Sequence, residues 1–141
     1  MRKIDKIIVH HSAGTDHPGV DFFNIYNWHV GHNKWSDVAY HHIIEEVDGK
    51  PIIVVGRPIT KVGAHAKGAN TGSIGICVVG VEHFSTATLA KLASIVDQLR
   101  EVFSLSRLAV YGHCEAGTTK TECPGEWLMK WIRNYRHEGV T

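Results

Sequence analysis

Cysteine, charge bias and long apolar runs are all scarce in this sequence, and each shortage excludes a class of protein. Three cysteines in 141 residues are too few for the disulfide framework of a small secreted scaffold, and they favour a reducing compartment. The 15 basic and 14 acidic residues leave a formal charge of +1, so we expect no nucleic-acid partner. No apolar run reaches the length of a membrane-spanning helix, so we expect no membrane insertion.

The N-terminal stretch MRKIDKIIVHHSAG also lacks the apolar core of a signal peptide, because only three apolar residues stand together before the histidines. We therefore expect synthesis in the cytoplasm without a signal peptide. With 43% hydrophobic and 21% charged residues, the chain has the balance of one globular domain. No repeat or linker divides it, so a single domain is expected over residues 1–141.

Common catalytic motifs are absent too: neither HExxH, nor CxxC, nor GxSxG occurs. The chain has instead eleven histidines, and histidine is the commonest metal ligand. The stretch GHCEAGTTKTECPGEW, residues 112–127, joins one of them, His113, to Cys123 in a segment rich in turn residues.

Strands are predicted from β-branched runs bounded by turn residues. They are expected over residues 4–11, 73–81 and 107–112. Two further runs, VAYHHIIEEV and PIIVV, flank Asp48 and Gly49, and this pair predicts a tight hairpin because both residues tolerate positive φ.

Helices are predicted where apolar residues recur at helical spacing, over 20–30, from Ser85 to Phe103, and from about Pro124 onward. The glycine-rich segment 56–72 has no period and is predicted to be a long surface loop, a kind of segment that is usually functional. Together these elements predict an α/β fold with a central mixed β-sheet flanked by helices.

A metal site follows from the same map. The first predicted strand ends on His10 and His11, which alternate across the strand so that only one can face a given site. If this strand lies beside the one that precedes His113 and Cys123, two imidazoles and a thiolate meet. Three protein ligands leave the fourth position of a zinc ion to water, as in catalytic sites. In a simpler interpretation, Cys123 is an inert buried thiol and His113 a histidine at a strand end.

Seven strings, in order, relate the chain to one family. They are IIVHHSAG, WSDVAYHHII, DGK, VGR, GAHAKGAN, SIGICVVG and GHCEAGTTKTECPG. This pattern, from about Lys6 to Trp131, resembles the zinc amidases of the N-acetylmuramoyl-L-alanine amidase type 2 family, which includes amidase-type phage lysozymes and peptidoglycan recognition proteins. The resemblance implies a phage endolysin that uses one zinc ion to hydrolyse the amide between N-acetylmuramic acid and L-alanine in bacterial peptidoglycan.

Carried over residue by residue, the resemblance implies that His10, His113 and Cys123 are the zinc ligands. Tyr40 matches the tyrosine that lies beside the metal in the family, where its hydroxyl orients the zinc water or donates to the oxyanion. Thr121 stands where amidase-type phage lysozymes carry a lysine, and Lys120 precedes it. Either side chain is expected to donate a hydrogen bond to the oxyanion.

Substrate-binding residues are implied in the same way. His65, Lys67 and Asn70 match a stretch that borders the substrate groove in the family, and Trp35 is a candidate for stacking on a sugar face. Each has a plainer interpretation as well: a solvated glycine-rich loop for the first three and a core tryptophan for Trp35. Without the resemblance, Tyr40 is more typical of a half-buried strand tyrosine, because tyrosine is enriched in strands.

We expect a monomer with bacterial peptidoglycan as its partner. Two alternatives stay open. One is a peptidoglycan-binding module without activity, although family members of that kind lack the cysteine ligand that Cys123 supplies. The other is an amidase that also binds and restrains a phage RNA polymerase.

Overall fold

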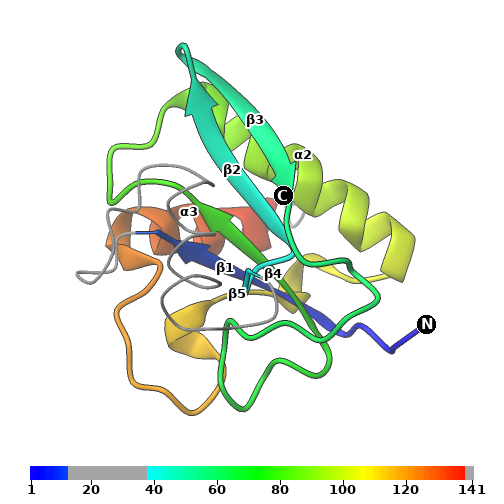
Figure 1. Ribbon diagram of the computed structural model, residues 1–141. Coiled ribbons are helices and arrows are strands. Elements are labelled where there is room, and N and C mark those ends of the chain that lie inside the picture. The colour runs from blue at the N-terminus through cyan, green and yellow to red at the C-terminus, as the bar shows by residue number, and fades with distance from the viewer. Residues whose placement is uncertain (13–37, 139–141) are drawn as a thin grey trace.

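The computed structural model describes residues 1–12 and 38–138 (Figure 1). The helix predicted over 20–30 and the candidate Trp35 lie outside these ranges. In the described part of the chain five strands form one sheet in the order β3-β2-β4-β1-β5. They are β1 (Lys6–His11), β2 (His42–Val47), β3 (Lys50–Val55), β4 (Ser73–Val78) and β5 (Val110–Gly112).

The sheet is mixed, as predicted. β1 pairs in parallel with both β4 and β5, β2 pairs in parallel with β4, and β3 runs antiparallel to β2. Asp48 and Gly49 adopt φ values of 52° and 78° and form the predicted two-residue turn between β2 and β3. The strand predicted over 73–81 ends earlier, at Val78, and Gly80 with φ of 137° lies in the bend that follows.

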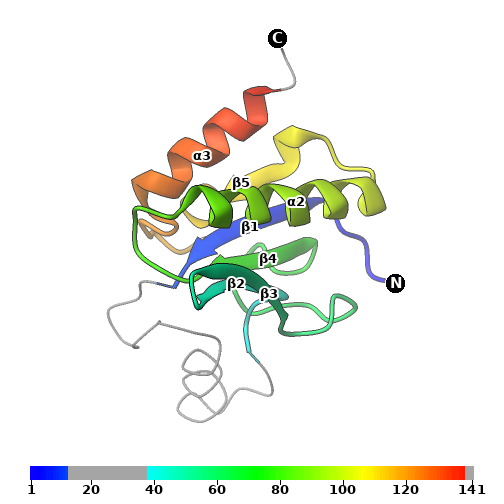
Figure 2. The same ribbon diagram turned by 90° about the horizontal axis from the view of Figure 1, so that it is seen from above.

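Two long helices, α2 (Thr86–Phe103) and α3 (Gly125–His137), agree with the sequence prediction. Ser85 caps α2, because its side chain accepts a hydrogen bond of 3.1 Å from the backbone N–H of Thr88. Both helices lie on the same side of the sheet (Figure 2). No helix within the described ranges has the length and apolar character needed to cross a membrane.

The segment 107–112 corrects one expectation, because only its second half is a strand. Arg107–Ala109 forms a 3-10 turn, and β5 begins at Val110. Arg107 is drawn toward α3, where its guanidinium lies 4.4 Å from the ring centroid of Tyr135 and donates to the Tyr135 carbonyl at 2.9 Å. This tertiary contact overrides the local strand preference.

The two faces of the sheet have different chemistry. Successive side chains of a strand point to opposite faces, and on β1 the side chains of Ile7 and Val9 belong to the hydrophobic core that the helices cover. His10 therefore points to the other face. On β4, Ile74, Ile76 and Val78 join the core, whereas a second set faces the side of His10. This set is Ser73, Gly75 and Cys77.

His41, which immediately precedes β2, fastens three segments together on that second face. Its Nδ1 atom accepts the backbone N–H of Gly75 at 3.0 Å, and its Nε2 atom lies 2.8 Å from the carbonyl oxygen of Lys61. The side chain is fully buried. Burial is the main cause that lowers the pKa of His41 from 6.5 to about 4.

This burial predicts a pH-dependent stability. Between pH 6.5 and about 4, His41 is protonated in the unfolded state and neutral in the folded state. The free energy of unfolding therefore rises with pH in this window. The contribution, about 3 kcal/mol, is complete above the unfolded pKa and is lost as pH falls through the folded one. Denaturant unfolding at pH 4.5 and pH 7 should show a smaller difference for His41→Asn than for the wild type.

The exposed His137 supplies the control, because His137→Asn should keep the wild-type pH dependence. Equal pH dependence in His41→Asn and wild type would contradict the assignment.

Candidate functional site

Three side chains from separate parts of the chain converge at the carboxyl end of β1. His10 lies near the end of β1, His113 directly follows β5, and Cys123 lies in the loop before α3. One potential ligand atom from each lies within 4.8 Å of the other two. The parallel register sets Val9 opposite Gly112, which brings the His10 and His113 ring centroids to 4.6 Å. The structure thus brings together the three residues for which the sequence predicted a shared site.

The geometry of this triad fits a metal ion. The Sγ atom of Cys123 lies 3.7 Å from Nδ1 of His10. Zinc–nitrogen and zinc–sulfur bonds of about 2.0 and 2.3 Å at a tetrahedral angle would set these atoms about 3.5 Å apart. In addition, the Nε2 atom of His113 is buried without a hydrogen-bond partner in the described structure. An orphaned imidazole nitrogen beside a thiol is the expected form of a metal ligand.

Burial keeps all three groups uncharged when no metal is bound. It lowers the pKa of His10 well below its usual range, with further lowering by the neighbouring His65 and His113. Burial also lowers the pKa of His113 and raises that of Cys123 to about 12. Neutral imidazoles offer lone pairs to a metal, whereas the thiol must release its proton to do so.

The loop that carries Cys123 is closed by backbone contacts. The N–H of Cys114 donates to the Cys123 carbonyl at 2.7 Å. Thr121 accepts the Cys123 N–H on its hydroxyl oxygen at 3.1 Å, which fixes the hydroxyl beside the triad while its proton remains available for donation. Lys120 is exposed on the same loop.

Tyr40 lies beside the triad, with its ring centroid 5.0 Å from that of His10. Its hydroxyl lies close to the buried Cys77 thiol. Burial, followed by the proximity of Cys77 and Cys123, raises the pKa of Tyr40 well above its usual value, so the phenol keeps a proton to donate. Cys77 was not predicted as a site residue; the alternation in SIGICVVG indicates only that it lies on the face opposite Ile76 and Val78, and the structure adds its register opposite His10.

His65 lies in the interior, behind His10, and not on an open groove. Its side chain is only 6% exposed. Its Nδ1 atom lies 2.8 Å from Nε2 of His10, and its Nε2 atom lies 3.1 Å from Oγ of Ser73. Burial lowers the pKa of His65 to about 3, which leaves the ring neutral.

The other two loop candidates occupy different environments. Asn70 accepts the backbone N–H groups of His65 and Ala66 on its Oδ1 atom at 2.9 and 2.8 Å, so its side chain shapes the loop. Lys67 is exposed, and its carbonyl accepts the N–H of Thr118 at 2.7 Å. The loop 56–72 therefore docks on the loop that carries Cys123. A substrate-binding role for these residues stays a prediction.

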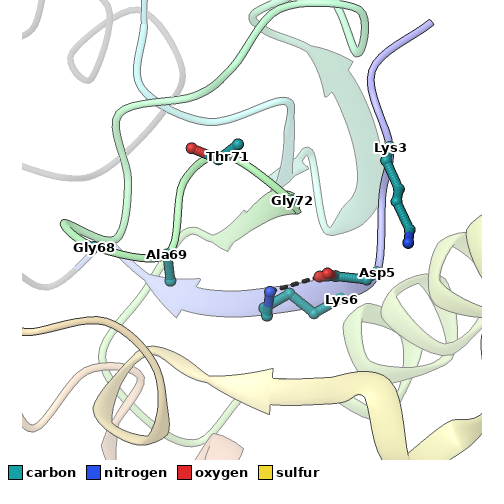
Figure 3. A pocket seen from close by; sticks show the side chains of 7 residues that line it. All are labelled: Lys3, Asp5, Lys6, Gly68, Ala69, Thr71 and Gly72. Atoms are coloured by element: carbon teal, nitrogen blue, oxygen red, sulfur yellow. Dashed lines mark hydrogen bonds and ion pairs between the residues drawn. The ribbon is translucent and has the colours of Figure 1, made fainter.

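A separate hollow lies at the opposite, amino end of β1 (Figure 3). Lys3, Asp5 and Lys6 line it together with the backbone around Gly72. The Asp5 carboxylate accepts a hydrogen bond from Lys6 Nζ at 2.5 Å, so part of its charge is already compensated. This hollow and the triad lie at opposite ends of β1. The triad therefore remains the candidate site.

The sheet and the triad together define a class: an α/β domain with a three-residue candidate metal site at the carboxyl ends of parallel strands. A family model for N-acetylmuramoyl-L-alanine amidase matches residues 1–126. The chain therefore belongs to the N-acetylmuramoyl-L-alanine amidase family and is an enzyme of that activity. The family membership and the fold class expected from the sequence are both confirmed.

Curated relatives of the chain include phage and insect proteins. The chain is 45% identical over 135 residues to the endolysin of Escherichia phage T7, covering 90% of this chain and 84% of the relative. It is 29% identical over 137 residues to peptidoglycan-recognition protein SC2 of Drosophila melanogaster, covering 91% and 72%.

Solved structures share the fold. Wild-type Drosophila PGRP-LB superposes with a TM-score of 0.79 at 24% identity, covering 97% of this chain and 84% of that one. The N-acetylmuramoyl-L-alanine amidase LysC from Clostridium intestinale gives 0.74 at 24% identity, covering 94% and 84%.

The close packing behind the triad generates a prediction at Gly112. A Cβ atom at this position would lie 2.2 Å from Met129 Sδ and 2.8 Å from Pro124 Cδ. We expect Gly112→Ala to lower the free energy of unfolding by about 1–3 kcal/mol, as overpacking does, because Pro124 is bonded to Cys123 and has little freedom to move. Denaturant unfolding would measure the loss. An unchanged stability would show that the flexible Met129 side chain moves aside without disturbing the loop.

Proposed function

We propose that His10, His113 and Cys123 hold one zinc ion with which this amidase cleaves the bond between N-acetylmuramic acid and L-alanine of bacterial peptidoglycan. The convergence of these three side chains within 4.8 Å, in a chain of the amidase family, carries the proposal. We also propose that residues 1–141 form one domain and that the enzyme acts as an endolysin on the host cell wall. The T7 endolysin, 45% identical, supports this role.

The bound zinc would supply Lewis acidity toward a carbonyl group at neutral pH. His10 and His113 contribute neutral nitrogen ligands, and Cys123 contributes a thiolate after releasing its proton. This donor set of two imidazoles and one sulfur leaves room for the substrate in the coordination sphere.

Two neighbouring hydroxyls are suited to the negative charge that develops on the lactyl carbonyl oxygen. Tyr40 retains its phenolic proton because burial raises its pKa. Thr121 is anchored through its oxygen to the Cys123 N–H, so its proton is free to point away from the loop. Hydrogen bonds of this type contribute roughly 3 to 4 kcal/mol to barrier lowering when they are pre-positioned. Lys120, exposed on the same loop, adds positive charge near the site.

Lys67 is the loop candidate whose position best suits contact with substrate. Its side chain is exposed, while its backbone is held against the Cys123 loop through Thr118. We propose that its ammonium group meets the carboxylates of the stem peptide. A solved PGRP-LCa and PGRP-LCx ectodomain complex, 26% identical with a TM-score of 0.78, is bound to tracheal cytotoxin, which supports a peptidoglycan-type ligand.

The reaction predicts a defined product. Purified zinc-loaded protein incubated with bacterial peptidoglycan should release stem peptides that carry a free L-alanine N-terminus, identified by mass spectrometry. A chelator should abolish their release, and added zinc should restore it. Intact peptidoglycan with tightly bound protein would instead indicate a binding module without activity.

The metal ligands predict a difference between two cysteines. Cys123→Ser should lose zinc and activity together, because a hydroxyl is a much poorer zinc ligand than a thiolate. The exposed Cys114 provides a matched control, and Cys114→Ser should retain a single equivalent of zinc by elemental analysis. Retention of zinc by Cys123→Ser would remove this residue from the site.

A further inference from the structure

We propose that His65 is a positioning residue that sets the tautomer of His10, so that Nδ1 of His10 is the atom presented to the metal. The inference rests on the proposed zinc site, but it concerns a proton arrangement that can be measured without metal. It assigns to His65 a role in the interior of the protein in place of contact with substrate.

The arrangement starts from a group that can only accept hydrogen bonds, the backbone carbonyl of Asn70. The hydroxyl of Ser73 lies 3.3 Å from this oxygen, within reach of its single proton. The same hydroxyl lies 3.1 Å from Nε2 of His65. With the Ser73 proton assigned to the Asn70 carbonyl, the Ser73 oxygen accepts, and His65 carries its proton on Nε2.

The consequence passes along the chain of hydrogen bonds to His10. A neutral imidazole has one N–H, so His65 with its proton on Nε2 offers Nδ1 as an acceptor. His10 Nε2 lies 2.8 Å from this atom and must be the donor. With its proton on Nε2, His10 presents an unprotonated Nδ1, the atom that lies 3.7 Å from Cys123 Sγ.

The protein holds the His65 ring in a close-fitting slot. A Cβ atom at Gly75 would lie 2.6 Å from Cγ of His65, and one at Gly63 would lie 2.7 Å from its Cδ2. The backbone N–H of His65 is also held, because it donates to Oδ1 of Asn70 at 2.9 Å. The ring thus has neither the room nor the backbone freedom to turn away from His10.

Such support has a measurable effect on metal binding. Partners of the non-coordinating nitrogen fix the ring orientation of a metal-bound histidine and raise its basicity, and their loss typically costs about 10- to 100-fold in metal affinity. Without His65 as acceptor, His10 would be able to carry its proton on Nδ1, and that proton would have to move before a metal could bind.

The first test compares zinc dissociation constants, measured by competition with a chromogenic chelator on folded protein. We expect His65→Leu, which removes the acceptor, to bind zinc about 10- to 100-fold more weakly than wild type. His65→Asn restores a carbonyl oxygen near the position of Nδ1 and should recover part of the loss. His137→Leu, at an exposed histidine, should bind as wild type does.

The second test reads the tautomer directly in the metal-free protein. Nitrogen-15 NMR of labelled histidines should show His10 protonated on Nε2 in wild type and a mixture of tautomers in Ser73→Ala. A wild-type His10 protonated on Nδ1 would overturn the proposal, as would folded His65→Leu with zinc affinity within about twofold of wild type. If His65→Leu fails to fold, His65→Asn and the wild-type spectrum decide.

The two proposals fail in different ways. A wild-type protein that binds no zinc refutes the proposed zinc site, while the spectrum still decides the tautomer of His10. A wild-type protein that binds zinc equally well with and without an acceptor at position 65 refutes only the role of His65.

Discussion

The candidate site depends on the parallel register that β1 makes with β4 and β5. This register sets His10 opposite Cys77 and Val9 opposite Gly112. A slip of one residue would reverse every side chain of β1, taking Ile7 and Val9 out of the helix-covered core and moving His10 into it. Ile7 and Val9 would then lie among the buried polar groups of the second face, and the core under the helices would lose their packing contacts. The hydrophobic core on one face of the sheet therefore enforces the position of the metal-ligand candidate on the other.

On the face of the sheet that carries His10, polar side chains are buried, and each of them needs a hydrogen-bond partner. His10, His65 and Ser73 are each almost fully buried, and an unpaired polar group in such a place would cost several kcal/mol. Each has a partner, and the series ends on the carbonyl of Asn70. A buried network with every member paired is rigid, and rigidity is what a pre-formed metal site requires.

Local signals account for the parts of the fold that the sequence predicts well. Asp48 and Gly49 mark the hairpin because the turn needs positive φ, and Ser85 marks the start of α2 because its hydroxyl caps the helix. The meeting of His10 with the 113–123 loop required the additional assumption that their strands are neighbours, which the family resemblance supported.

The position of His65 was beyond the same reasoning. Its segment is rich in glycine and has no hydrophobic period, a pattern that predicts a surface loop. Only the close approach of Gly63 and Gly75 makes room for the ring inside the protein, and such an approach is a tertiary property. The strand predicted to begin at Arg107 was wrong for a similar reason. The turn there depends on the contact of Arg107 with the ring of Tyr135, which is distant in the sequence.

The loop 56–72 supports the triad from two sides, and this dual contact links features that otherwise look independent. Through His65 it contacts His10, and through the carbonyl of Lys67 it holds Thr118 in the loop that carries Cys123. The second contact needs Gly117, whose φ is 86° and where a Cβ atom would lie 2.5 Å from the Lys67 oxygen. The strands thus determine the face to which His10 points. The loop, by our proposal, determines which nitrogen of His10 carries the proton, and it also determines the separation of His10 from Cys123. Since we propose that Lys67 meets the substrate, a contact made there would act on the same segment that supports both sides of the candidate metal site.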